Sequence, residues 1–303
     1  MAENVLERTF TLPGGFFNNG SCFHEVKLRA LTGRVEELLA EASDSEILAS
    51  AITTLLVNCI EQIGPITDIT PEIPRNLLVG DRDYLLMKLR QITIGNRVEA
   101  TLVCPNPQCA KKIDMDFDLS HIPIKKGRIS SRVFTLKLPN RAKGKKTGTE
   151  GQYKVDFRLP NGGDQEALAP LILKDESEAV NKLLMRCIQG IDGDNNIDEH
   201  RIKKLPSSIR RRIEKAMSDL APQIDLDMEA TCPECKRTFP FPFNMSQYFL
   251  DEMKAKLDQL YREVHSLAFY YKWPESEILS MTTRKRRKYL ELLAEQIEIN
   301  KKE

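Results

Sequence analysis

Four of the seven cysteines stand in two pairs whose spacing suits a metal site. CPNPQC holds Cys104 and Cys109, and CPEC holds Cys232 and Cys235 far along the chain. A closed structural zinc site takes four ligands in a tetrahedron, and each pair supplies only two. The spacing in CPEC is the common one, whereas that in CPNPQC lies at the wide end of the usual range. The pairs are therefore either one shared site or free thiols on two tight turns.

The spacing of further cysteines indicates an internal repeat. Cys59 precedes Cys104 by 45 positions and Cys187 precedes Cys232 by 45, so the two sets are offset by 128. We call each cysteine pair with its turn, CPNPQC or CPEC, a knuckle. After the second cysteine of each knuckle, apolar residues alternate at the same distances from it, as in a half-buried strand. Such self-similarity at a fixed offset is the signature of a duplicated unit. Two apolar stretches match at the same offset, NLLVGDRDYLLMKLRQI (76–92) and KLPSSIRRRIEKAMSDL (204–220).

The repeat predicts the fold class and the domain organisation. Upstream, VKLRALTGRVEELL (26–39) corresponds to VDFRLPNGGDQEAL (155–168) with a slip of one residue. Each half then reads as a hairpin, two helices and a strand–knuckle–strand hairpin. We predict an α+β fold, a duplicated hairpin–helix–helix–zinc-knuckle unit with a C-terminal helical tail. The expected domains are a first repeat with CPNPQC (1–125), a second repeat with CPEC (126–245) and an amphipathic helical tail (246–303).

Equivalent knuckles favour the shared site. They can meet across a pseudo-twofold axis and offer four thiolates to one structural Zn²⁺, which would leave no open position for water or substrate. The alternative is that the thiols are free and bind no metal. Cys59 and Cys187 lie in apolar helical patterns and are expected to be buried in the core, and Cys22 has no obvious partner. The predicted ligands are Cys104, Cys109, Cys232 and Cys235.

No set of catalytic residues stands out, so the chain is not expected to be an enzyme. DGDNNIDEH (192–200) lacks the glycine and the last glutamate of a calcium loop, and the four histidines are scattered. With 41% hydrophobic and 29% charged residues and a net charge of +1, the chain reads as a soluble globular protein. That balance argues against a global nucleic-acid or membrane-surface role. Neither a secretory signal nor a membrane span is expected.

Two segments are expected to make contacts outside the repeats. RAKGKKTGTEG (141–151) is predicted to be a flexible hairpin tip, either solvated or ordered by a partner. After the second knuckle, apolar residues step by three and four, which predicts one long amphipathic helix ending at Trp273-Pro274. A short helical turn and a last helix, capped by Thr282 or Thr283, should follow.

The tail helices either pack on the protein's own body or dock on another subunit. An aromatic cluster near Trp273 favours docking on another subunit. RKRRK (284–288) allows a rival from another class, a zinc-ribbon nucleic-acid-binding protein. Glutamates follow closely, so a solvated helix start or a patch for an acidic protein is the preferred interpretation. The predicted partner-binding residues are Leu257, Leu260, Val264, Tyr271, Trp273, Arg284, Arg286, Arg287, Leu290 and Leu293.

Three stretches carry a resemblance to a known family: LTGRVEELL (31–39), DRDYLLMKLRQITIG (81–95) with its cysteine hairpin, and LYREVHSLAFYYKWPESEILSMTTRKRRKYLELL (260–293). They resemble the baseplate proteins of T-even-type contractile phages, which include a baseplate hub subunit and a baseplate hub assembly catalyst, with relatives in phage-like injection particles. Shorter members show one copy of the repeat, whereas this chain carries two and the tail.

The resemblance implies a structural component or assembly factor of a contractile tail baseplate. It implies other baseplate or hub subunits as partners, and the family offers no catalytic residues to carry over. We expect no small-molecule substrate and no membrane. The expected location is the cytoplasm of the producing bacterium or the tail particle itself.

Overall fold

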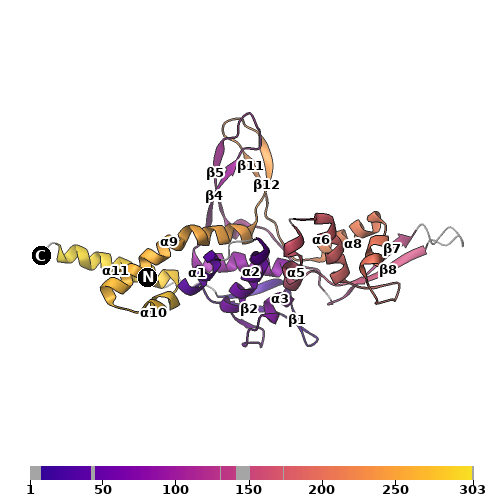
Figure 1. The fold of residues 1–303 in the computed structure, drawn as a ribbon, viewed down its shortest axis with the longest axis horizontal. Helices are drawn as coiled ribbons and strands as arrows, with labels where there is room; N and C mark the ends of the chain where they lie inside the picture. The colour runs from indigo at the N-terminus through magenta and orange to yellow at the C-terminus, as the bar shows by residue number, and fades with distance from the viewer. Residues whose placement is uncertain (1–7, 42–44, 130, 141–150, 173, 302–303) are drawn as a thin grey trace.

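The computed structural model describes residues 8–41, 45–129, 131–140, 151–172 and 174–301. It has two bodies side by side, a tower of hairpins above them and a helical arm at the C-terminal end (Figure 1). Helices and sheets are mixed, as predicted. The predicted hairpin tip at 141–151 lies almost wholly outside the described residues. None of the helices described is long and apolar enough to cross a bilayer.

The first body is a three-stranded antiparallel sheet covered by helices. Its strand order is β1-β2-β3, and the two helices between β2 and β3 return the chain to the sheet. Two more helices then lead to a hairpin. The elements are β1 (Thr9–Asn18), β2 (Ser21–Leu28), α1 (Gly33–Glu41), α2 (Ser45–Cys59), β3 (Ile60–Ile63), α3 (Glu72–Asn76), α4 (Val79–Thr93), β4 (Arg97–Val103) and β5 (Lys112–Asp118).

The second body has the same order of elements. Its sheet runs β7-β8-β9, and again two helices lie between the second and third strands. The elements are β7 (Phe134–Asn140), β8 (Gly151–Phe157), α5 (Gly162–Ile172), α6 (Glu176–Cys187), β9 (Ile188–Ile191), α7 (Glu199–Lys204), α8 (Ser207–Leu220), β11 (Asp227–Thr231) and β12 (Thr238–Pro242). A short helix η1 (Leu119–His121) and the strand pair β6 (Ile124–Lys125) and β10 (Gln223–Ile224) connect the parts.

Each helix that carries a core cysteine ends earlier than its apolar pattern suggests. The run TLLVNCIEQIG leaves the helix at Cys59, and Ile60–Ile63 joins the edge of the sheet. The second body does the same after Cys187. Both thiols are buried, as predicted, with 1% and 0% of the residue exposed, and burial raises the pKa of each to about 12. They are therefore inert core thiols.

The tail continues from the first core. Helix α9 (Met245–Tyr271) begins by packing Phe249, Leu250 and Met253 into the core of the first body. Lys272 ends it in a left-handed conformation, one residue before the predicted Trp273-Pro274 stop. Helices α10 (Glu275–Ser280) and α11 (Thr283–Asn300) follow, with Thr282 as the predicted cap of α11. The tail thus begins on the protein's own body and extends away from it as an arm (Figure 1).

The two bodies meet where α5 begins against α3 and α4. The N–H of Gly162 donates to the carbonyl of Leu77 at 3.0 Å. Under this glycine lies the buried guanidinium of Arg82, which donates to the carbonyls of Pro74 and Ala49 at 2.9 Å each. A Cβ at position 162 would stand 2.0 Å from Nη1 of Arg82. The junction therefore requires glycine for space.

We expect Gly162→Ala to destabilise the protein by roughly 1–3 kcal/mol, the usual cost of overpacking a core. Gly163→Ala is the matched control, because its Cβ would meet nothing closer than 3.5 Å. Urea unfolding midpoints measure both. Equal midpoints for the two variants would show that the contact does not constrain the junction.

The start of α4 carries a buried carboxyl group. Asp81 is 0% exposed, its Oδ1 accepts the N–H of Gly14 at 2.7 Å, and its Oδ2 has no partner among the described residues. Burial raises the pKa of Asp81 from 3.8 to about 7, against the opposing effect of the Gly14 and Gly15 amides. Because the folded protein then binds this proton more tightly than the unfolded chain, stability falls as the pH rises from about 4 to about 7.

Asp81→Asn should remove this contribution while keeping an oxygen acceptor for Gly14. The free energy of unfolding, measured in urea at several pH values between 5 and 8, should decrease less steeply in the variant than in the parent. Parallel curves would mean that Asp81 is ionised throughout that range.

Candidate metal centre

The tower consists of two hairpins, β4–β5 and β11–β12, and both pack at their bases on the core of the first body through residues such as Phe117, Met228 and Phe243. β4 pairs with β5 without a break from Arg97↔Asp118 to Val103↔Lys112, and β11 pairs with β12 from Asp227↔Pro242 to Thr231↔Thr238. Both hairpins rise from the first body and meet at their tips (Figure 1). The regular ladders therefore carry the two cysteine knuckles to the same place.

The two knuckles close in the same way although CPNPQC is longer. The N–H of Cys104 donates to the carbonyl of Lys111 at 2.9 Å, and that of Cys232 donates to Arg237 at 3.0 Å. The residue after each second cysteine is left-handed, with φ of 45° at Ala110 and 59° at Lys236. Non-glycine residues seldom adopt this conformation, so each turn is held by its ladder and its hydrogen bonds.

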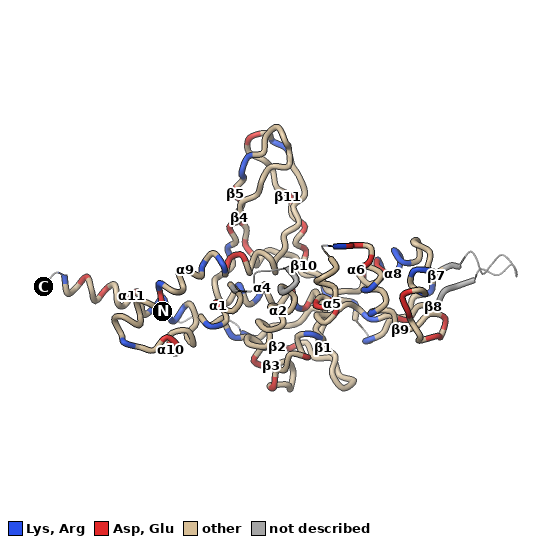
Figure 2. Tube along the Cα trace, viewed as in Figure 1, with Lys and Arg blue, Asp and Glu red and all other residues tan. Residues whose placement is uncertain are grey.

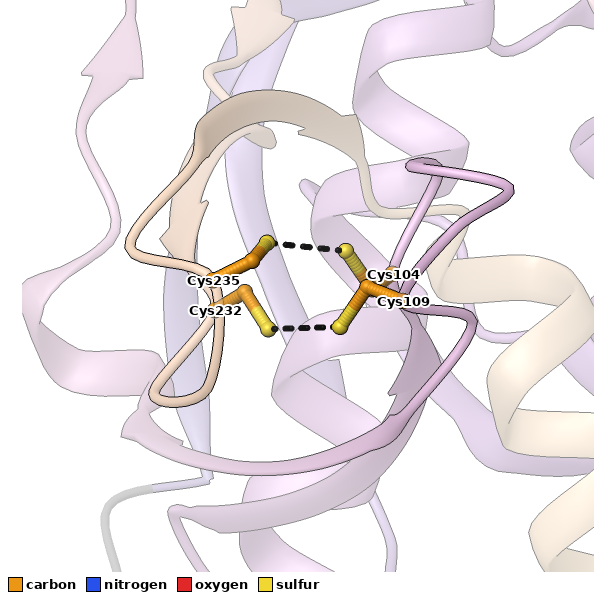
Figure 3. Close-up of side chains that lie close together, drawn as sticks. All are labelled: Cys104, Cys109, Cys232 and Cys235. Carbon is orange, nitrogen blue, oxygen red and sulfur yellow. Dashed lines mark hydrogen bonds between the residues drawn. The ribbon is translucent and has the colours of Figure 1, made fainter.

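The four predicted ligands converge, as Figure 3 shows. The Sγ atoms of Cys104 and Cys235 are 3.7 Å apart, those of Cys109 and Cys232 are 3.8 Å apart, and all four lie within 4.8 Å of one another. A tetrahedron with metal–sulfur bonds of about 2.3 Å has sulfur–sulfur edges of about 3.8 Å. Disulfide sulfurs lie far closer, at about 2.05 Å, and all four thiols are free. The arrangement fits a closed four-thiolate site.

The surroundings of the thiols differ between the two sides of the centre. Cys104 and Cys232 are buried over an apolar floor that includes Ile113, whereas Cys235 is exposed. The N–H of Arg237 lowers the pKa of Cys235 to about 7, which favours the thiolate that binds metal. The backbone N–H of Asn106 lowers the pKa of Cys104, but desolvation and the neighbouring thiols outweigh this effect and raise that pKa to about 11. A bound cation would favour the thiolate form of all the cysteines that contact it.

The residues predicted to bind a partner lie on the arm, many of them packed within it. Arg284 and Arg287 are exposed, and Leu293 is half-buried. Arg286 is buried, with 1% exposed. Their contact with a partner remains a prediction. The apolar ones form or border a small core of the arm: Leu257, Leu260, Val264, Tyr271, Trp273 and Leu290.

The arm is held by ion pairs that the sequence pattern did not predict. Arg286 donates through Nε to Glu263 at 3.0 Å and through Nη2 to Glu36 at 2.8 Å. Glu263 stands three residues after Leu260 and four before Leu267, on the apolar stripe of α9. A carboxylate on the apolar face of a helix is buried and needs a cation beside it. The position of Glu263 was therefore the feature of the sequence that could have predicted the ion pair.

Comparison with known proteins gives one match. A family model described as T4 bacteriophage base plate protein matches residues 8–250, which include both bodies, all four clustered cysteines and the start of α9. No curated protein and no solved structure matches the chain. Because the family model covers most of the sequence, the chain belongs to the family of T4 bacteriophage base plate proteins.

Proposed function

We propose that this protein is a non-enzymatic component or assembly factor of a contractile phage tail baseplate, or of a related injection particle, and acts through contacts with other baseplate subunits. The observation that carries the proposal is the family match over residues 8–250. The sequence shows no set of catalytic residues, which is consistent with a non-enzymatic role. The protein would work in the cytoplasm of the producing bacterium and in the tail itself.

We infer that the four cysteines bind one structural Zn²⁺ that clamps two duplicated units together. Four thiolates select soft, tetrahedral ions and leave no position for a reacting water. Duplication is supported by the shared order of elements and by hydrogen bonds at matching positions, such as Arg29 N–H to Cys59 and Arg158 N–H to Cys187, both at 2.9 Å. The division into 1–125, 126–245 and 246–303 is part of this proposal.

The nucleic-acid-binding alternative has no specific observation in its favour. Within RKRRK (284–288), Arg286 is enclosed by two glutamates, and Lys288 lies 3.2 Å from Glu291. Arg286 is therefore not available to phosphate groups, whereas the other four basic residues of the run are exposed. Exposed charge of this kind is equally typical of a solvated helix start, so it does not favour nucleic acid specifically.

Zinc content provides the first test. Cys232→Ser should reduce bound zinc from about one ion per chain to nearly none and lower the unfolding midpoint, because metal binding contributes roughly 10–16 kcal/mol of apparent free energy to such sites. Elemental analysis and thermal unfolding measure the two effects. Cys22→Ser is the matched control, since Cys22 is exposed and lies outside the cluster. Zinc content that stays unchanged in Cys232→Ser would falsify the shared site.

Recovery from the producing host tests the biological assignment. The tagged chain, pulled down during particle production and analysed by mass spectrometry, should bring down baseplate proteins, whereas the untagged chain should not. Presence in mature particles would identify a built-in subunit, and presence only in intermediates an assembly factor. Recovery with nucleic acid and without baseplate proteins would reject the proposal.

A further inference from the structure

The same helix pair occurs three times in this chain. α3–α4, α7–α8 and α10–α11 each consist of a short helix, two extended residues and a long helix. The first extended residue has nearly the same conformation in all three, with φ and ψ of −64° and 142° at Leu77, −65° and 131° at Leu205, and −79° and 148° at Met281. The fourth residue of each long helix is an arginine: Arg82, Arg210 and Arg286. We refer to each pair as a socket.

Two of the sockets hold the same kind of segment. The start of α5 lies on α3–α4, where Gly162 N–H donates to Leu77 at 3.0 Å. The start of α1 lies on α10–α11, where Gly33 N–H donates to Met281 at 3.1 Å. In both cases the residue before the glycine forms a β-bridge with the socket, as Asn161 with Leu78 and Thr32 with Thr282. An extended segment that ends in Thr-Gly or Asn-Gly and continues as a helix is therefore the common occupant.

The socket arginine explains why the occupant carries glycine. A Cβ at Gly33 would lie 2.9 Å from Nη1 of Arg286, and one at Gly162 would lie 2.0 Å from Nη1 of Arg82. Each occupant helix also presents a glutamate to its socket. Glu36 accepts from Arg286 at 2.8 Å, and Glu166 accepts from Arg75 at 2.9 Å.

The third socket, α7–α8, carries no such segment in the described part of the chain. No hydrogen-bond donor among the described residues reaches the carbonyl of Leu205, the counterpart of Leu77 and Met281. Pro206, Ser207 and Ser208, which form its rim, are exposed. Arg210 is already held in place, donating to Asn181 at 2.6 Å as Arg82 donates to Thr53 at 3.0 Å. The socket is thus built like the others and open.

The charge of the open socket suits an acidic helix start. Lys203 stands where Arg75 stands in the first socket. Each already pairs with a glutamate of its own short helix, Lys203 with Glu199 and Arg75 with Glu72, and Lys203 also lies 3.7 Å from Glu178. Lys204 lies beside Lys203 on the exposed surface. Basic positions recur along the first turns of α8 (Figure 2). A glutamate on the first turns of an incoming helix would meet these cations as Glu36 and Glu166 meet theirs.

We propose that α7–α8 docks a Thr-Gly or Asn-Gly helix start from a separate protein of the baseplate, with a glutamate near its first turn. The two segments of this kind in the described chain are both used within the molecule, so a further one must come from elsewhere. That the partner is a baseplate protein rests on the proposed function. The kind of segment that fits the socket is inferred from the contacts in the two occupied sockets and does not rest on it. The docked segment joins one subunit to the next.

The probe is a fluorescent peptide of residues 29–40, RALTGRVEELLA, added to the full-length chain. The native α10–α11 socket is filled by a tethered copy at an effective concentration of about millimolar, so the free peptide finds only α7–α8 open. We expect saturable binding by fluorescence anisotropy, and at least tenfold weaker binding for a peptide with Gly33→Leu. Absence of saturable binding at peptide concentrations well below millimolar, where the tethered copy still fills α10–α11, overturns the proposal.

Two protein variants locate the binding. Arg210→Leu removes the socket arginine. Ser207→Pro removes a backbone N–H and a hydroxyl at the first position of α8. At the same position of the occupied sockets, Val79 donates its N–H to Pro160 and Thr283 donates its hydroxyl to Glu36. Proline is well tolerated at the first position of a helix, and Pro206 already has the extended conformation that precedes it, so Ser207→Pro should fold normally. Each variant should weaken peptide binding at least tenfold. Undiminished binding in both would place the peptide elsewhere and overturn the proposal.

Sedimentation of the chain alone separates the partner from a second copy. A monomer that binds the peptide supports a separate donor protein. Self-association that Ser207→Pro abolishes would assign the socket to a second copy of this chain and overturn the proposed partner. Recovery of baseplate proteins from the host does not depend on peptide binding or on sedimentation. If the peptide does not bind α7–α8, the proposed baseplate function is therefore unaffected. If no baseplate proteins are recovered, the binding of the peptide is equally unaffected.

Discussion

A buried guanidinium group under a glycine fixes how the parts of this chain join. Arg82 and Arg286 are each 1% exposed, and removing such a cation from water is costly unless its donors all find acceptors. Arg82 finds mostly backbone carbonyls, and burial lowers its pKa to about 10 against the field of Glu166, so it remains charged at neutral pH. Its acceptors Ala49, Thr53 and Pro74 all lie in the first body, and Nε has no partner among the described residues. The guanidinium is thus held in place within the first body, and the second body fits against it only through a residue without a side chain, Gly162.

The thiol cluster joins the tips of two long hairpins whose bases both pack on the core of the first body, as the ring contact of Phe117 with Phe243 shows. It lies away from the α5 junction (Figure 1). The cluster has hardly any core of its own, with Ile113 as its main buried aliphatic residue, so its cohesion depends on what the sulfurs hold. The hairpin tips are therefore held at the thiol cluster, whereas the α5 junction depends on packing and hydrogen bonds.

The sequence predicted what short-range patterns determine and missed what tertiary contacts determine. The stripe in α9, the Thr282 cap and the meeting of four cysteines follow from spacing alone. β3 and β9 were missed because four apolar residues after a helix read as more helix, and only the neighbouring strand makes them extended. The pairing of Arg286 with Glu36 was invisible for a similar reason, since the two residues lie far apart in the chain.

The repeated junction gives the chain a direction. The second body docks its helix start on the first, and the first docks its helix start on the arm, so both of these glycine contacts run from the helix start of one part to the helix pair of another. In such head-to-tail arrays each unit satisfies only its neighbours, and the terminal unit must be capped or bound. The arm provides the helix pair that receives the first body. On α7–α8, no donor among the described residues reaches the Leu205 carbonyl, and the rim stays exposed, so this helix pair is the one to which a further segment can be added.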